Sequence, residues 1–147
     1  MFAGEKFNEH GVANTMDRAL NAIEREVIEF AVRLVDGTLQ HRDDIDALLQ
    51  GVTRNWDLRR MAIVDRNVLR MAVFELKFCA DVPPKVAINE AIEIGKKFST
   101  ANSGGFVNGI LDRIRIDLVQ QRTAEKAAGS KKDAEAADGA TAGNEQA

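Results

Sequence analysis

Between residues 24 and 122, hydrophobic residues recur at intervals of three and four, which is the spacing of one face of an α-helix. No stretch alternates between apolar and polar residues with the period of two that a half-buried strand shows. The first clear helical pattern covers residues 24–36, and Gly37 is expected to end it, because glycine suits the position after a helix. The apolar face of this segment comprises Val27, Ala31, Leu34 and Val35.

Two further helices are predicted in the middle of the chain. One opens at Arg42 with Asp43 and Asp44 in its first turn, where negative charge is favourable. The other follows Asp65, which can cap its first turn, and a short apolar and basic segment at residues 58–63 lies between the two helices as a further candidate. Their apolar stripes are Ile45, Leu48, Leu49 and Val52 in the first helix and Val68, Leu69, Ala72, Val73 and Leu76 in the second.

A pair of prolines marks the start of the next helix. Pro83 and Pro84 lack the N–H that a first helical turn leaves unpaired, and Asp81 just upstream can cap that turn. Residues 99–105 are small and polar and predict a loop, in which Ser103 can cap a last helix. The apolar positions are Ala87, Ile88, Ala91, Ile92 and Ile94 in the first of these helices and Val107, Ile110, Leu111, Ile114 and Leu118 in the last.

These patterns predict an all-α fold in which short connections join packed antiparallel helices. The 147 residues suggest one domain. Residues 123–147 hold no large apolar side chain, so burial there cannot offset the entropy of ordering, and this tail is predicted to be disordered and dispensable. The expected organisation is an atypical N-terminal segment at residues 1–23, a helical domain at residues 24–122 and the disordered tail.

Net charge argues against a broadly basic surface for nucleic acid. The chain carries a net charge of −3, and its tail, with three lysines and five acidic residues, accounts for −2 of it. Residues 1–122 are therefore almost neutral. Any nucleic-acid site must be a local patch.

Catalysis, metal binding and membrane insertion find little support in the sequence. His10 and His41 stand far apart without spaced Cys, Asp or Glu residues around them, and the single cysteine, Cys79, is best interpreted as a packing thiol. No apolar run approaches the roughly 18 residues that span a bilayer, and the N-terminus lacks the apolar core of a secretory signal. We therefore expect a cytoplasmic protein that is not an enzyme and needs no cofactor or metal.

Two strings of residues carry a resemblance to a known family. The run Asp-Val-Pro-Pro-Lys-Val-Ala-Ile-Asn-Glu-Ala covers residues 81–91, and Phe-Val-Asn-Gly-Ile-Leu-Asp covers residues 106–112. The sequences of these two strings and their separation along the chain closely resemble the C-terminal half of the NusB family of bacterial transcription antitermination factors. The resemblance covers roughly residues 26–116 and is strongest over residues 64–112.

The resemblance implies a compact all-helical fold of two small bundles, the NusB type, and a function without catalysis. The family binds a short RNA element, boxA, in leader and ribosomal RNA transcripts. It does so as a heterodimer with NusE, which is also a protein of the small ribosomal subunit. The complex helps RNA polymerase to read through terminators, so the implied partners are single-stranded boxA-like RNA, NusE and the antitermination complex, with no membrane.

Two departures from the family pattern weaken the expected RNA contacts. Family members usually open with an arginine-rich helix, whereas the region before Glu24 holds only Lys6 and Arg18 as cations. Either the chain lacks that helix or the true start lies upstream. The family also places a lysine just before the phenylalanine, and this chain has Gly105 there, which removes one charge that could neutralise a phosphate.

The resemblance places RNA contacts at the connection before the last helix. Asn102 and Ser103 are ordinary capping residues, yet a helix N-terminus also suits a phosphate or a base edge. Phe106 is either a core aromatic or a ring on which a base stacks. Lys85 and Lys97 are either a solvated helix surface or phosphate contacts, and the second interpretation requires that they share a face with Phe106.

Charged residues near the middle of the chain are candidate contacts with the protein partner. Five arginines between residues 54 and 70 are most simply a solvated or ion-paired surface, because acidic residues interleave them. By resemblance, the helix that starts near residue 65 lies on the NusE-binding side. The candidate partner contacts are Asp65, Arg66, Glu75 and Glu90.

Three functions remain open from the sequence. The first is an RNA-binding antitermination factor that acts with NusE on boxA-type RNA in ribosomal RNA transcription. The second is a protein-interaction module that binds NusE but has weakened RNA affinity, because the arginine-rich helix is not seen. The third is a NusB-like RNA-binding domain related to that of ribosomal RNA cytosine methyltransferases.

Overall fold

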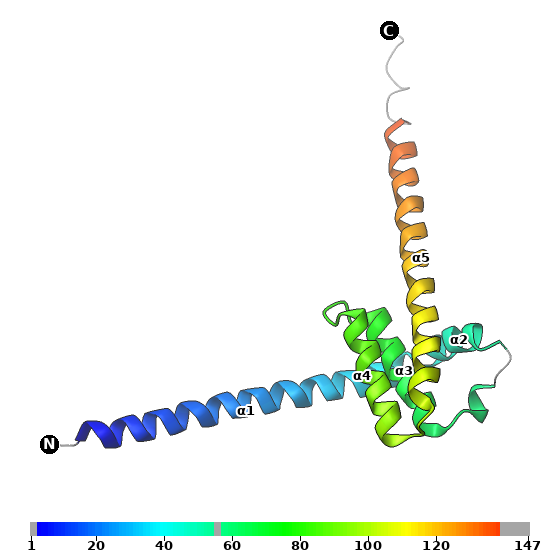
Figure 1. Cartoon of the computed structure of the whole chain (residues 1–147). Coiled ribbons are helices and arrows are strands. Elements are labelled where there is room, and N and C mark those ends of the chain that lie inside the picture. Colours follow the sequence, from blue (N-terminus) through cyan, green and yellow to red (C-terminus); the bar gives the residue numbers. More distant parts are fainter. Residues whose placement is uncertain (1–2, 55–56, 139–147) are drawn as a thin grey trace, which may run out of the picture. The chain divides into compact units, whose positions relative to one another are not determined.

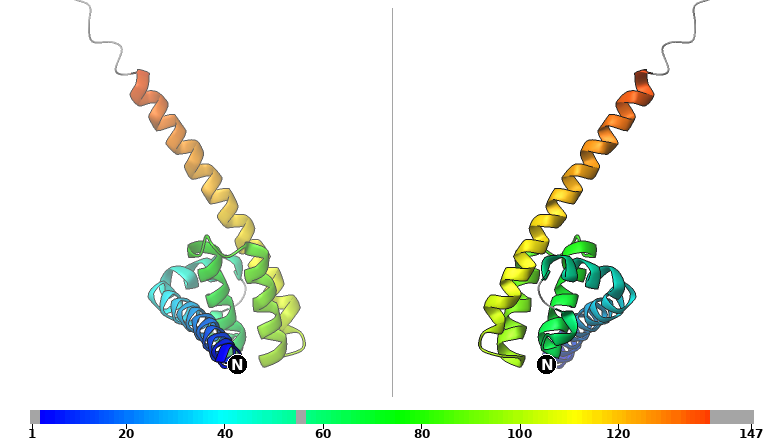
Figure 2. Two further views of the ribbon diagram at one scale, coloured as in Figure 1. Left: turned by 90° about the vertical axis from the view of Figure 1, so that its left-hand side faces the viewer. Right: turned by 90° about the vertical axis from the view of Figure 1, so that its right-hand side faces the viewer.

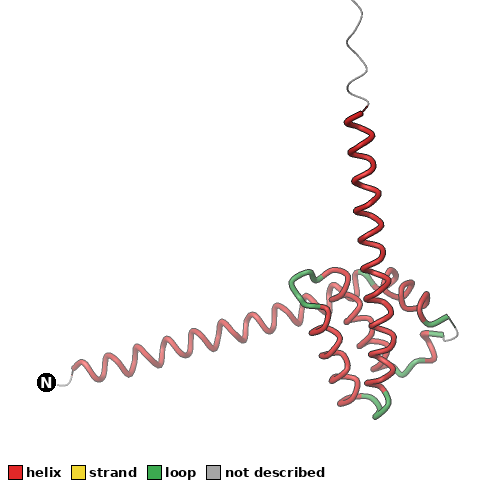
Figure 3. The backbone as a smooth tube through the Cα atoms, turned by 45° about the horizontal axis from the view of Figure 1, so that its top comes forward, coloured by secondary structure: helices red, strands yellow, loops and turns green. Residues whose placement is uncertain are grey.

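The computed structural model describes residues 3–54 and 57–138, and within these residues it contains helices and loops but no strand (Figures 1 and 3). The predicted all-α fold is therefore confirmed. In chain order the elements are α1 (Ala3–Gln40), α2 (Arg42–Val52), the short 3-10 helix η1 (Leu58–Arg60), α3 (Ile63–Phe78), α4 (Pro84–Phe98) and α5 (Ser103–Asp138).

The chain forms two compact units, Met1–Arg42 and Asp43–Ala147. The first consists of α1, which runs without a break through both position 23 and Gly37. The expected stop at Gly37 is thus wrong: no described glycine has a positive φ, and the helix continues to Gln40. A glycine inside a helix costs only about 1 kcal/mol relative to alanine, which a long helix tolerates.

Helix α1 exposes a row of large apolar side chains. Leu20, Ile23 and Val27 are 54%, 58% and 63% exposed, and Phe30 is 38% exposed. Their spacing of three, four and three residues places them on one face of the helix.

The core of the second unit lies between α3, α4 and the first part of α5, which pack against one another in pairs (Figure 2). Helix α2 adds Ile45 and Leu49, both fully buried. The predicted stripes of α3 and α5 are both buried throughout. The largest fully buried apolar side chains are Ile45, Leu49, Leu69, Val73, Val107, Leu111 and Ile114.

Neither of the two predicted capping residues stands at the N-cap position of its helix. The N-cap of α3 is Ala62, without a side-chain cap, and Asp65 lies inside the first turn. The N-cap of α4 is Pro83, again without a side-chain cap, and Asp81 lies two positions before it. The prolines do start α4 as expected, because their fixed φ suits the first turn.

The structure differs from the expected irregular tail, since α5 continues as a helix to Asp138. Leu118 is its last buried residue, and every described side chain from 119 to 134 is exposed. Near this point Arg122 donates a hydrogen bond of 3.3 Å from Nη2 to the carbonyl of Leu76 at the end of α3. Residues 139–147 lie outside the described part of the chain.

Candidate functional site

The connection between α4 and α5 presents the predicted site at one end of the core helices. Thr100, Ala101 and Asn102 are exposed. The carbonyl of Asn102 accepts a hydrogen bond of 3.4 Å from the N–H of Phe106, so Asn102 stands at the N-terminal boundary of α5. Its carboxamide is therefore at the surface, beside the end of a helix that favours negative charge.

Ser103, by contrast, is a structural residue. It is 1% exposed, and its Oγ donates to Oδ2 of Asp65 in α3 at 3.1 Å. The same oxygen accepts a hydrogen bond from the N–H of Thr100 at 3.1 Å. In this structure the hydroxyl therefore holds the connection onto α3, and the expectation of a direct RNA contact through Ser103 is corrected.

Asp65 likewise does not offer its carboxylate to a partner. It is 8% exposed, and its Oδ1 is buried without a hydrogen-bond partner. Its Oδ2 bonds to Ser103, the first residue of α5, where the helix dipole stabilises a nearby anion. The predicted contact between Asp65 and a protein partner is therefore corrected to an internal role that joins α3 to α5.

The aromatic that is best placed for stacking is Phe98, which was not among the residues predicted from the sequence. Its side chain is 62% exposed at the end of α4, whereas Phe106 is half-buried. The ammonium of Lys97 lies 5.3 Å from the centroid of the Phe98 ring. The available signal was its position next to a predicted loop, but only tertiary packing decides whether such a ring is covered.

Lys85 lies in a different place from Phe106. It lines a shallow surface pocket between α4 and α5, together with Asn108 and Arg115. Phe106 and Asn108 are two positions apart on one helix, so their side chains point about 160° apart. The structure therefore separates the predicted RNA-binding residues: Asn102 and Phe106 belong to the connection, Lys97 stands just before it, and Lys85 belongs to the pocket.

The other predicted partner contacts differ in exposure. Glu90 is exposed, whereas Glu75 is 7% exposed. Burial raises the pKa of Glu75, and the nearby charge of Glu90 raises this pKa further. Arg66 is half-buried and donates from Nη1 to the carbonyl of Leu58 at 3.3 Å. Glu90 is thus the candidate whose charge is open to a partner.

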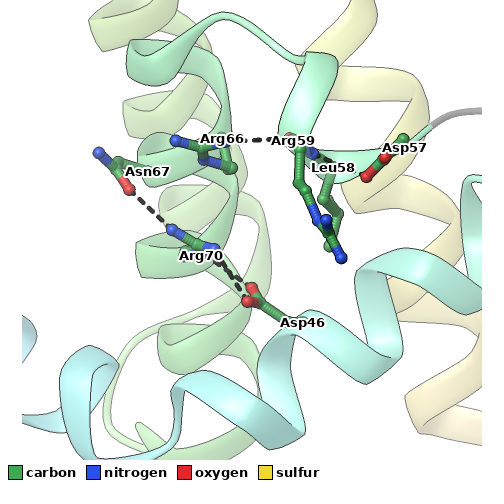
Figure 4. A network of polar contacts seen from close by, with 7 residues as sticks. All are labelled: Asp46, Asp57, Leu58, Arg59, Arg66, Asn67 and Arg70. Atoms are coloured by element: carbon green, nitrogen blue, oxygen red, sulfur yellow. Dashed lines mark hydrogen bonds and ion pairs between the residues drawn. The ribbon is translucent and has the colours of Figure 1, made fainter.

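One of the five arginines between residues 54 and 70 forms an ion pair within the fold. Arg70 of α3 donates to both carboxylate oxygens of Asp46 in α2, from Nε at 2.7 Å and from Nη2 at 2.8 Å (Figure 4). Its Nη1 also donates to the Asn67 side chain at 3.2 Å. The predicted ion-paired surface is confirmed for Arg70, which joins α2 to α3.

No group of three or more His, Cys, Asp or Glu side chains among the described residues could hold a metal ion. Within the same residues, no helix combines the length and apolar character needed to cross a bilayer.

Comparison with known proteins places these features in a family. The model of the NusB family matches residues 2–115. A transcription antitermination protein NusB from Anaeromyxobacter dehalogenans is 51% identical over 109 residues, which are 74% of this chain and 76% of the relative. That relative is named for a role in transcription and not for an enzyme activity.

Solved structures agree on the fold. NusB of T. maritima is 50% identical, with a TM-score of 0.57 over 59% of this chain and 61% of that one. A chain from a crystal structure of NusB and NusE with double-stranded RNA is 31% identical, with a TM-score of 0.56 over 60% of this chain and 65% of that one. Because the family model matches most of its length, this chain belongs to the NusB family of transcription antitermination proteins.

Proposed function

We propose that this chain is an RNA-binding transcription antitermination factor that acts with NusE on boxA-type RNA in ribosomal RNA transcription. The observation that carries the proposal is the exposed connection between α4 and α5, where Lys97 lies over the Phe98 ring at the end of α4 and Asn102 is exposed just before α5. In this proposal the RNA is single-stranded over the contacted bases, the partners are NusE and the RNA polymerase antitermination complex, and the protein is cytoplasmic.

The chemistry of this end suits single-stranded RNA. Bases of such RNA are bound by stacking on aromatic rings and by hydrogen bonds to their edges. Phe98 and Phe106 can supply rings worth roughly 1–3 kcal/mol per stacked base. The carboxamide of Asn102 can both donate and accept, and the first N–H groups of α5 favour a phosphate.

The small net charge of the helical domain limits its affinity for RNA, and NusE can supply further contacts. Residues 1–122 are almost neutral, so few phosphates are neutralised and the salt dependence of binding should be shallow. A partner that binds beside the same RNA adds the missing contacts. Glu90 and Arg66 are the proposed contacts with NusE. A solved structure that contains NusB and NusE with double-stranded RNA supports NusE as the partner.

The test is titration of a labelled boxA-like RNA, with and without NusE, against the wild type and the Phe106→Ala and Phe98→Ala variants. Loss of a stacked base should weaken binding about tenfold, and NusE should strengthen binding to the wild type. Glu93→Gln, at an exposed position, serves as the control. A double-stranded competitor shows whether the RNA must be unpaired. Unchanged affinity in both aromatic variants, with their helical circular dichroism intact, would overturn the proposal.

Gly105 favours a second candidate, a module that binds NusE and has little RNA affinity of its own. The position is exposed and carries no side chain, whereas the resemblance to the NusB family places a lysine there. This candidate predicts that NusE binding is retained in both aromatic variants and that added boxA-like RNA does not tighten it.

A further inference from the structure

A cluster of polar side chains lines the pocket between α4 and α5. It contains two cations, two carboxamides and one carboxylate over an apolar side chain: Lys85, Ile88, Asn89, Asn108, Asp112 and Arg115. The side chain of Ile88 is 7% exposed and forms part of the floor. No aromatic residue lines this pocket, which distinguishes it from the connection that carries Phe98.

The packing of the two helices brings this cluster together. Near the other end of α4, Gly95 faces Ser103 and Val107, and a Cβ on Gly95 would lie 3.6 Å from each of these side chains. This close approach holds the helices side by side. Lys85 and Asn89 are one turn apart on α4, and residues 108, 112 and 115 follow the same periodicity on α5. Each set therefore lines the same groove.

The charges in the pocket are arranged for an anion beside hydrogen-bonding groups. Asp112 accepts hydrogen bonds from Nε and Nη2 of Arg115, at 3.2 and 2.9 Å, which fixes the orientation of the guanidinium. Lys85 forms no ion pair with any described residue. The carboxamides of Asn89 and Asn108 are exposed, and each offers a donor and an acceptor.

A ligand that satisfies all four groups has a phosphate next to a heterocyclic base. We propose that this groove is a second nucleotide subsite for single-stranded RNA, in which Lys85 and Arg115 contact a phosphate and Asn89 and Asn108 contact a base edge. The proposal rests on the proposed function and deepens it, because it extends the RNA path beyond the connection. Paired RNA would fit poorly, since its base edges are already hydrogen-bonded.

A path along α5 links the two sites. Gly105 and Gly109 are exposed, lie between the directions of Asn108 and Phe106 around the helix, and would carry a Cβ with nothing within 4 Å. An RNA strand can therefore approach the backbone of α5 closely at these two glycines. From Asn102 to Arg115 the helix rises about 20 Å, which an extended strand of a few nucleotides can follow.

The experiment compares a short RNA that reaches only the connection with a longer one that extends along α5, both with NusE present. The groove variant is Lys85→Gln with Arg115→Gln. It should bind the longer RNA about tenfold more weakly, with a salt slope smaller by about 1–2, and bind the short RNA like the wild type. The charge-matched control, Lys126→Gln with Lys131→Gln on the exposed part of α5, should bind both RNAs normally. Equal losses in the groove variant and the control would overturn the proposal.

A second variant keeps the charge and tests the carboxamides. Asn89→Ala with Asn108→Ala should lower affinity for the longer RNA only, with an unchanged salt slope. If either groove variant loses NusE in the absence of RNA and keeps its RNA affinity, the groove is a protein contact and the proposal is wrong.

Crosslinking separates failure of this inference from failure of the proposed function. A single-stranded RNA with photoreactive uridines should crosslink to peptides that contain residues 85–89 or 108–115. Groove crosslinks without any at residues 98–106 would support the subsite and reject binding at the connection. Crosslinks confined to the connection would reject the subsite alone.

Discussion

The hydrogen bond between Ser103 and Asp65 shows that a residue predicted to lie at the surface can have a structural role inside the fold. Both residues are polar, and both stand near predicted helix starts, so a surface role was a natural interpretation. The structure instead buries them against each other, with Ser103 1% and Asp65 8% exposed. A buried polar group needs a partner, and here the Ser103 hydroxyl donates to Oδ2 of Asp65, while Oδ1 of Asp65 is left without a hydrogen bond. The pair positions the connection whose exposed neighbours face solvent.

Glu75 provides a prediction about pH. Its pKa is raised by burial and by Glu90, so the folded state binds this proton more tightly than the unfolded chain does. The contribution to stability is therefore complete below the ordinary carboxyl pKa and is lost as pH rises through the raised pKa. Glu75→Gln cannot ionise and should be more stable than the wild type at neutral pH, with no advantage at about pH 4.

Urea unfolding at several pH values measures this difference. Glu93→Gln, whose side chain is 69% exposed, is the matched control and should show no such dependence. A Glu75→Gln variant that is less stable than the wild type at neutral pH would show that the charged carboxylate is favourable where it lies.

Gly105 provides a prediction of gained function. A Cβ there meets nothing within 4 Å, so a long side chain fits without displacement of its neighbours. Gly105→Lys should strengthen boxA-like RNA binding several-fold and steepen its salt slope by about 1, because one more phosphate is neutralised. Gly105→Gln separates charge from the loss of glycine and should leave the slope unchanged. Equal salt slopes for both variants would place the RNA elsewhere.

At the scale of elements, one ion pair joins α2 to α3. Arg70 and Asp46 have side chains 14% and 26% exposed and form two parallel hydrogen bonds. Asp46→Ala should cost about 1–3 kcal/mol, because it leaves a largely buried guanidinium without its acceptor. Chemical denaturation measures the loss, and Asp43→Ala at an exposed position of α2 is the control.

A double-variant cycle with Arg70→Ala isolates the pair itself. If the two single losses add without a coupling energy, the ion pair contributes nothing beyond the side chains that form it.

Helix α1 gives a second prediction at this scale. It exposes a continuous row of apolar side chains, around Ile23 and Val27, whereas most protein surfaces expose apolar side chains singly. Such a row favours self-association. Sedimentation equilibrium at rising concentration should show association for the wild type. Ile23→Gln with Val27→Gln should reduce it, whereas Arg18→Gln with Glu29→Gln, on the opposite side of the helix, should not. A strictly monomeric wild type at the highest concentration would contradict this prediction.

At the scale of the whole molecule, residues 123–147 should be dispensable for stability. The described side chains from 123 to 134 are exposed, so removal of this stretch uncovers no core. A chain that ends at Arg122 should keep the thermal midpoint of the wild type within about 1–2 °C. A chain that ends before Leu118 is the comparison and should be clearly less stable, because Leu118 is 6% exposed. A large loss on the first truncation would show that the tail docks.

The helices themselves were predictable because their signals are local. Apolar spacing over four residues, the acidic first turn of α2 and the prolines before α4 act between near neighbours in the chain. The same locality explains the errors at Gly37 and in the tail. A glycine or a polar composition lowers helix stability by small amounts, which do not by themselves fix where a helix ends.

The sequence motifs around Pro83 and Phe106 were enough to indicate the family, which the comparison confirms. Tertiary structure alone decided which polar groups are buried and which rings are open. Ser103 and Asp65 are 38 positions apart, and Lys85 and Arg115 are 30 apart, so no local pattern relates them. Their meeting depends on how α3, α4 and α5 pack, and the same packing leaves Phe98 exposed while it buries Glu75.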